Sequence, residues 1–137
     1  MSKSERKNEI ILLVIVILIG AFIAWANIPL NIQKIESRFV VMENPGFDLT
    51  PGYLGFGGLT QNSSTMRNIT ITNEFSKKVK IKIETSDDIE GYVFASENNF
   101  YLEPSESKTI IFTAKSKNLE LGNYSGEISI ISKRTFW

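Results

Sequence analysis

The first pattern along the chain is an unbroken apolar run near its N-terminus. Residues Ile10–Ala26 read IILLVIVILIGAFIAWA and contain no charged residue. At about 1.5 Å per residue, a helix over this run is long enough to cross a hydrocarbon layer of about 30 Å. Trp25 stands near the end of the run, as interfacial aromatic residues do, and Pro29 discourages further helix. The pattern predicts one transmembrane helix over residues 10–28.

From Ser37 onward the pattern changes, and apolar residues alternate with polar ones at a period of two. Turn-forming residues such as Pro, Gly and Asn separate the alternating segments. Two facing sheets can bury the apolar faces of such segments, whereas isolated hairpins are not stable. The pattern predicts an all-β domain, a seven-stranded antiparallel β-sandwich. The seven expected strands are 37–43, 68–73, 78–84, 92–96, 99–102, 108–115 and 124–132.

The phase of the alternation assigns residues to the two faces of the strands. Eight residues are expected to face inward: Ile69, Ile71, Val79, Ile81, Ile83, Phe112, Ile128 and Ile130. On the outward face, Lys78, Lys80 and Lys82 continue from Lys77 as a basic stripe. Contact with anionic lipid headgroups or an acidic partner is one interpretation of the stripe. We favour the other, a solvated sheet face or an edge strand that lysines protect against pairing.

These patterns divide the chain into four parts. Residues 1–9 are expected to be a cytoplasmic N-terminus, 10–28 a signal anchor, 29–36 a linker, and 37–137 an extracytoplasmic sandwich. A removed signal peptide is the competing interpretation, because Ala24-Trp25-Ala26 resembles a cleavage site. The apolar run is longer than the usual h-region, which favours an uncleaved anchor. We therefore expect a single-pass protein of the cell membrane.

Composition narrows the chemistry of the domain. The chain has 137 residues, with 15 Lys and Arg against 15 Asp and Glu, and has neither His nor Cys. The usual zinc ligand sets, Ser-His-Asp and Cys-His nucleophile systems and disulfides are therefore excluded. A net charge of zero argues against a nucleic-acid partner, since neutralising phosphates needs a basic excess. We expect no enzyme activity and no cofactor.

Two short motifs invite a ligand interpretation that their context does not support. The acidic segment 87–90 (DDIE) could offer oxygens to Ca²⁺, but it lacks the Gly and the spacing of an EF-hand loop. We interpret it as a solvated turn. The glycines of segment 54–59 (LGFGGL) could suggest a phosphate-binding loop, but no strand-loop-helix context follows. A β-bulge or a kink in the sheet accounts for them better.

Two sets of candidate sites remain. Asn62, Asn68 and Asn123 each fit the N-glycosylation pattern, and we expect the more accessible Asn62 and Asn123 to be modified first. Near the C-terminus, Arg134, Phe136 and Trp137 are candidate partner contacts, because aromatic residues beside Arg are typical binding anchors. We expect this tail at the membrane-distal tip. The alternative is that the last strand continues and its aromatic residues pack on a neighbouring loop.

Four segments together resemble a known family: LGFG (54–57), NITITN (68–73), YLEPSES (101–107) and LGNYSGEI (121–128). Their order is similar to that in immunoglobulin-like domains of the major sperm protein, Hydin and pilus-chaperone type. Ser105 stands where these domains usually carry Gly, which implies a different turn. A membrane span before a single domain of this kind resembles archaeal cell-surface proteins and, more loosely, archaellum stator subunits. The resemblance implies an immunoglobulin-like sandwich that acts as a binding or scaffolding module.

The sequence thus predicts a membrane-anchored, non-enzymatic binding or scaffolding protein of a cell-surface assembly. Its expected partners are membrane lipid, through the N-terminal span, and another cell-surface protein. The alternative is a subunit of a surface filament, either pilin-like or linked by strand exchange. The pilin-like form is less favoured, because segment 6–9 (RKNE) offers no small residue to cut after before the apolar run.

Overall fold

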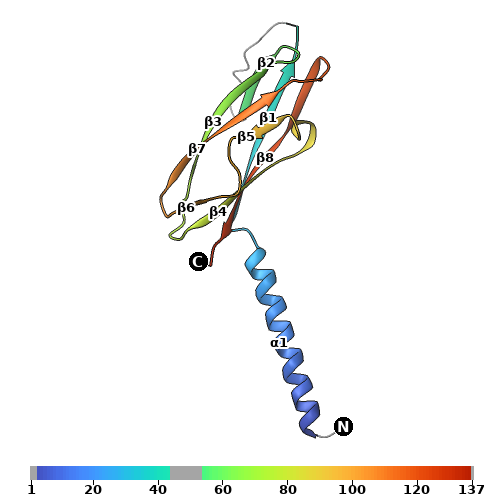
Figure 1. The fold of residues 1–137 in the computed structure, drawn as a ribbon, viewed down its shortest axis with the longest axis vertical. Helices are drawn as coiled ribbons and strands as arrows, with labels where there is room; N and C mark the ends of the chain where they lie inside the picture. The colour runs from blue at the N-terminus through green and yellow to red at the C-terminus, as the bar shows by residue number, and fades with distance from the viewer. Residues whose placement is uncertain (1–2, 44–53, 137) are drawn as a thin grey trace.

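The structure, a computed structural model, describes residues 3–43 and 54–136. One long helix, α1 (Lys3–Asn27), is followed by strands that form two sheets. Figure 1 shows the helix projecting from one end of the β domain, with its N-terminus far from both sheets. The architecture is therefore an N-terminal apolar helix followed by a sandwich-like, mostly β domain. The structure thus confirms an apolar N-terminal helix followed by a β domain of two sheets.

From Ile10 to Ala26, helix α1 is apolar on all sides. Between Ile10 and Ile23 its large apolar side chains are 46% to 66% exposed, so the β domain does not cover them. The segment Ser4–Asn27, with a hydropathy of 2.8, is long and apolar enough to cross a membrane, a test that a signal sequence also passes. The helix ends shortly before Pro29, and the Asn27 side chain donates a hydrogen bond to the Ile23 carbonyl at 2.8 Å.

The larger sheet has five strands in the order β2-β1-β8-β4-β6. All pairs in it are antiparallel except β1 with β2, which is parallel. The five strands are β1 (Asn31–Val41), β2 (Leu54–Leu59), β4 (Val79–Thr85), β6 (Phe100–Leu102) and β8 (Gly122–Arg134). Three residues separate the end of α1 from the start of β1, so residues 31–36, assigned above to a linker, are the first half of this strand.

The smaller sheet has three antiparallel strands in the order β3-β7-β5. These strands are β3 (Ser64–Thr72), β5 (Val93–Ala95) and β7 (Ser107–Lys115). A short 3₁₀ helix, η1 (Asp87–Ile89), follows β4 and lies against β8. Gly126 of β8 permits this contact, because a Cβ there would clash with the Ser86 carbonyl oxygen and come within 2.7 Å of Ile89. The glycine is therefore required by close packing.

The strand count and the pairing differ from the prediction. All seven predicted strands are present, but the glycine-rich segment Leu54–Leu59 forms an eighth strand among the described residues, and its parallel pairing makes the larger sheet mixed. Glycine is depleted in strands, so the glycines of this segment predict a bulge or a kink and not a strand. The bulge itself is confirmed: the β1–β2 register shifts between Arg38 and Val40, where Gly57 has a φ of 79°.

The core between the sheets matches the predicted phase. Of the eight residues expected to face inward, seven are buried, and Ile69 is half-buried and packs against the core. The largest fully buried side chains are Phe39, Phe112, Ile81, Ile89, Leu102, Ile110 and Ile128. At about 25 cal/mol per Å² of buried apolar surface, this cluster is the main stabilising contribution to the domain.

Of the two structural interpretations of the lysine stripe, the solvated sheet face agrees with the structure and the edge strand is wrong. Strand β4, which carries Lys80 and Lys82, lies between β8 and β6. Strand β6 pairs with residues Val79–Ile81 only, and beyond it the Asn98 side chain replaces a strand. Its amide accepts a hydrogen bond from the Ile83 N–H and donates one to the Ile83 carbonyl, both at 2.7 Å. The lysines are thus on the outer face of an interior strand and do not protect an edge.

Candidate functional site

The C-terminal tail lies beside the helix, and the prediction of a tail at the opposite tip is wrong. Strands β1 and β8 are antiparallel, and their register pairs Asn31 with Ser132. The start of β1 and the end of β8 therefore share one end of the β domain, at which α1 joins. We call this end the base. Figure 1 places the C-terminal end of the ribbon next to the last turn of α1.

Arg134, a predicted partner contact, binds the end of the helix. Its Nη1 donates hydrogen bonds to the carbonyl oxygens of Trp25 at 3.3 Å and Ile28 at 3.0 Å. Its guanidinium carbon lies 4.6 Å from the centroid of the Trp25 ring, a cation–π contact. The last carbonyls of a helix lack internal partners and carry partial negative charge. Arg134 thus compensates the C-terminus of α1.

Phe136 packs on the same helix. Its ring centroid lies 6.1 Å from that of Phe22 and 6.2 Å from that of Trp25, and these two rings are 6.1 Å apart. The three rings form an aromatic cluster at the base. Arg134 and Phe136 are therefore used within the chain, against the helix and not against a loop. Trp137, the third predicted contact, lies outside the described residues.

A buried asparagine fixes the loop next to the tail. Asn73 is 2% exposed, and its Nδ2 donates to the carbonyl oxygens of Lys77 at 2.9 Å and of Leu102 and Glu103 at 3.0 Å. Its Oδ1 accepts a hydrogen bond from the Phe75 N–H at 3.0 Å. One side chain thus joins loop 73–78 to turn 103–106. Sequence reasoning missed this role, because Asn in a turn has simpler explanations.

Ser105 lies in turn 103–106, next to loop 73–78. This residue has a φ of 63°, the left-handed conformation that glycine adopts most readily. Its N–H donates to the Asn73 carbonyl at 2.9 Å. Ser105 thus adopts a backbone conformation that residues other than glycine rarely adopt. The hydrogen bond to Asn73 holds the turn against loop 73–78.

A pocket of about 400 Å³ opens where tail, loop and helix meet; we call it the junction pocket. Its nine lining residues are Trp25, Leu30, Phe75, Ser76, Lys77, Lys78, Arg134, Thr135 and Phe136. Lys78 is 2.6 Å from the Glu103 carboxylate, whose hydrogen bond and negative charge raise the pKa of Lys78. Thr135 Oγ1 donates to the Lys78 carbonyl at 2.8 Å. The pocket is cationic and aromatic, and its walls are hydrogen-bonded to one another.

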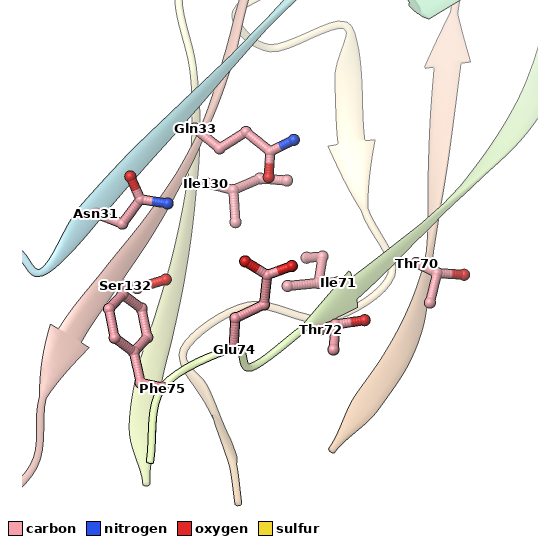
Figure 2. A pocket seen from close by; sticks show the side chains of 9 residues that line it. All are labelled: Asn31, Gln33, Thr70, Ile71, Thr72, Glu74, Phe75, Ile130 and Ser132. Atoms are coloured by element: carbon pink, nitrogen blue, oxygen red, sulfur yellow. The ribbon is translucent and has the colours of Figure 1, made fainter. Parts of the chain in front are cut away.

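A second hollow, of about 590 Å³, lies between the two sheets and is shown in Figure 2. The Glu74 carboxylate points into it, and the amides of Asn31 and Gln33 line the opposite wall. Toward the far end of the domain, Arg67 Nε closes the opening between the sheets with a 2.9 Å hydrogen bond to the Gly55 carbonyl. We call the open part the inter-sheet groove.

The acidic segment 87–90 forms η1 and the turn after it. Asp87 and Asp88 border a shallow hollow together with Glu36 and Glu127, and Glu127 is bonded to Lys34 at 3.0 Å. Across residues 3–43 and 54–136, no group of three or more acidic residues is placed to hold a metal ion. The calcium interpretation therefore gains no ligand set from the part of the chain that the structure describes.

The three glycosylation candidates lie in different settings. Asn62 is exposed in a turn with a φ of 59°, and its side chain accepts a hydrogen bond from the Asn118 N–H at 3.3 Å. Asn68 is exposed in the middle of β3. Asn123 is also exposed, but it is the second residue of β8 and not part of a turn as predicted. Modification of all three stays a prediction.

An apolar patch on the outer face of the smaller sheet escaped the sequence analysis. Met66 is 62% exposed, Phe94 46% and Ile111 40%. The register pairs both Met66 and Phe94 with Thr113, which is two residues from Ile111 on the same face of β7. We call these three side chains the outer patch. The outward phase of Met66 and Ile111 was the available signal, but only the sheet order brings Phe94 beside them.

Comparison of the chain with family models, with curated proteins and with solved structures found no match.

Proposed function

We propose that the chain is a single-pass, membrane-anchored protein that is not an enzyme and binds another cell-surface protein through its β domain. The observation that carries the anchor is the junction between helix and tail. Arg134 and Phe136 contact Trp25, a residue 109 positions from Arg134. Removing the helix as a signal peptide would destroy these contacts. A helix retained in the mature protein is what the packing of the tail supports.

The second part of the proposal is an immunoglobulin-like binding module with its N-terminus in the cytoplasm and the domain outside. The weak excess of Lys and Arg before the span supports this orientation. The outer patch is the surface that we assign to the partner, since Met66, Phe94 and Ile111 are exposed large apolar side chains. Asn68 pairs with Ile111 in the β3–β7 register. A glycan on Asn68 and a docked partner would therefore compete for this face.

The anchor is tested by extraction of native membranes that contain the full chain. Alkaline carbonate should leave the chain in the membrane, because the apolar run stays in the hydrocarbon layer, and only detergent should release it. A chain of full mass that carbonate releases would contradict the anchor. Intact mass spectrometry of the same material checks whether the helix has been cut.

The binding surface is tested in those membranes by a photocrosslinking residue placed at Met66. A matched control carries the same residue at Glu84, an exposed position on β4 of the other sheet. We expect a discrete protein adduct from position 66 and none from position 84. Equal adducts from both positions would indicate random encounters, and would refute the assignment of the outer patch.

The alternative function, a filament subunit, has one observation in its favour. Among the described residues, the first half of β1 pairs with β8 only, because pairing with β2 begins at Ser37. This free edge borders the inter-sheet groove, where an added strand could pair (Figure 2). Strand exchange predicts ladders of polymers after mild detergent extraction, and a pilin-like subunit predicts a trimmed N-terminus. Monomers with an intact N-terminus would exclude both forms.

A further inference from the structure

We infer that the junction pocket binds the phosphate of an anionic lipid headgroup. This inference rests on the proposed function, because it requires α1 to span a membrane. The lipid belongs to the leaflet on the side of the β domain. Lys77 and Arg134 are the residues that we assign to the phosphate.

The depth of the pocket supports this assignment. The apolar run ends at Ala26, and the pocket begins at Trp25 and Leu30. A headgroup layer adds about 5 to 8 Å to each side of the hydrocarbon core. Side chains that contact the last turn of α1 therefore lie within that layer. The cluster of Trp25, Phe136 and Phe22 has the aromatic character typical of the membrane interface.

The charge of the pocket also fits an anion. None of its nine lining residues is acidic. Lys78 is paired with Glu103, whereas Lys77 and Arg134 have no carboxylate partner among residues 3–43 and 54–136. The partial negative charge at the C-terminus of α1 would repel a phosphate, but Arg134 Nη1 already binds its carbonyls. Arg has five N–H donors, so others remain for phosphate oxygens.

The Arg134 guanidinium and the backbone that carries Lys77 are held in place before any ligand arrives. Asn73 binds the Lys77 carbonyl, Thr135 binds the Lys78 carbonyl, and Arg134 binds the helix. A site whose backbone is already ordered loses little conformational entropy on binding. The inter-sheet groove lacks these features, since Glu74 points into it and would repel an anion (Figure 2). The phosphate is therefore expected at the junction pocket and not between the sheets.

The test uses the full chain in nanodiscs of equal amounts of phosphatidylcholine and phosphatidylglycerol. After transfer to detergent, native mass spectrometry gives the ratio of the two lipids retained on the chain. The variant is Lys77→Gln, since Lys77 is exposed and its substitution should not disturb folding. Lys117→Gln is the matched control, an equally exposed lysine that lines a hollow at the opposite end of the domain.

We expect the wild-type chain to retain phosphatidylglycerol in preference, Lys77→Gln to lower that preference about fivefold, and Lys117→Gln to leave it unchanged. Equal ratios in the wild type and both variants, or an equal fall in both variants, would overturn the site. Saturable binding of inorganic phosphate to the detergent-solubilised chain, lost in Lys77→Gln, would assign the pocket to a soluble anion and overturn the lipid. Failure of the chain to enter nanodiscs would refute the membrane anchor as well, whereas insertion without lipid preference would refute this inference alone.

Discussion

The two ends of the β domain are closed by different chemistry. At the far end, loop 60–63 meets the segment after β7 through a buried hydroxyl: Ser116 Oγ donates to the Thr60 carbonyl at 2.6 Å and accepts from the Ser63 N–H at 3.0 Å. The base uses the amide of Asn73 in the same way, and then adds a guanidinium and an aromatic ring against α1. Within residues 3–43 and 54–136, the base is the end that contacts a further element, helix α1.

The two ends satisfy the unpaired backbone groups of their loops in different ways. Loops at either end of a sandwich leave backbone N–H and carbonyl groups unpaired, and a buried polar side chain can satisfy several of them at once. Among the described residues of the far end, Ser116 plays this part, and exposed residues such as Asn62 and Lys117 face solvent. At the base the end of the helix brings further carbonyls, those of Trp25 and Ile28, which Arg134 binds. The base is therefore specialised for the helix and, under our proposal, for the membrane surface.

Asn73→Ala should have the largest effect on this base. The change removes the two amide N–H groups, which are shared among three carbonyl oxygens, and the amide oxygen that accepts one hydrogen bond. We expect a loss of about 3 to 5 kcal/mol in the free energy of unfolding, because buried backbone groups lose their partners. Chemical denaturation followed by circular dichroism measures it. A loss below about 1 kcal/mol would show that water replaces the amide and that the base is not organised by Asn73.

Ser116→Ala is the corresponding change at the far end. Its hydroxyl is fully buried, and its loss leaves the Ser63 N–H and the Thr60 carbonyl without this partner. Because one small hydroxyl is lost in place of an amide, we expect a smaller cost of about 1 to 3 kcal/mol. The same denaturation experiment applies. A larger cost than that of Asn73→Ala would reverse the ranking of the two ends.

The sequence predicts the core of this fold far better than its ends. Period-two alternation places Ile81 and Ile128 inward, because burial of one sheet face leaves no other choice. The location of the tail depends on β8 pairing with β1, which begins six residues earlier than predicted. Asn31, Gln33 and Lys34 at its start are polar and exposed, so no alternation marks them as a strand. The start of β1 and the location of the tail were both predicted wrongly, because they depend on pairing between distant strands, which local sequence patterns do not show.

The candidate site shows the same limit. Residue type alone marks Arg134 and Phe136 as candidate contacts, because aromatic residues beside Arg are typical binding anchors. Their contact with Trp25 could not be foreseen, since it joins residues separated by most of the chain. Lys77 was noticed as part of a stripe, but its place beside the helix depends on the Asn73 hydrogen bonds. Residue type therefore identifies candidate residues, whereas their positions in the site depend on contacts between distant parts of the chain.

Arg134→Gln should loosen the joint between helix and domain more than it destabilises the domain. The variant loses the cation–π contact with Trp25 and the charged hydrogen bonds to the helix carbonyls. We expect the free energy of unfolding to fall by about 1 kcal/mol. The distribution of distances between spin labels on α1 and on the far end of the domain should become broader. Arg134→Lys, which keeps the charge but not the planar donors, should be intermediate. Unchanged distributions in both variants would mean that the joint is held by Phe136 alone.

The smallest effect is expected from the exposed pair of Lys78 and Glu103 at the base. The hydrogen bond and charge of Glu103 raise the pKa of Lys78 above its ordinary value of 10.5, so the folded state holds this proton more tightly than the unfolded state. The contribution to stability is therefore complete below about pH 10.5 and is lost as the pH rises through the raised pKa.

Lys78→Met should lower Tm slightly at pH 8, and the difference from wild type should shrink toward pH 11 and in high salt, which screens exposed pairs. Lys117→Met at the far end should show no such dependence on pH. A Lys78→Met difference that persists unchanged above pH 11 would assign the effect to the packing of the side chain on the Tyr101 ring, 5.8 Å away, and not to its charge.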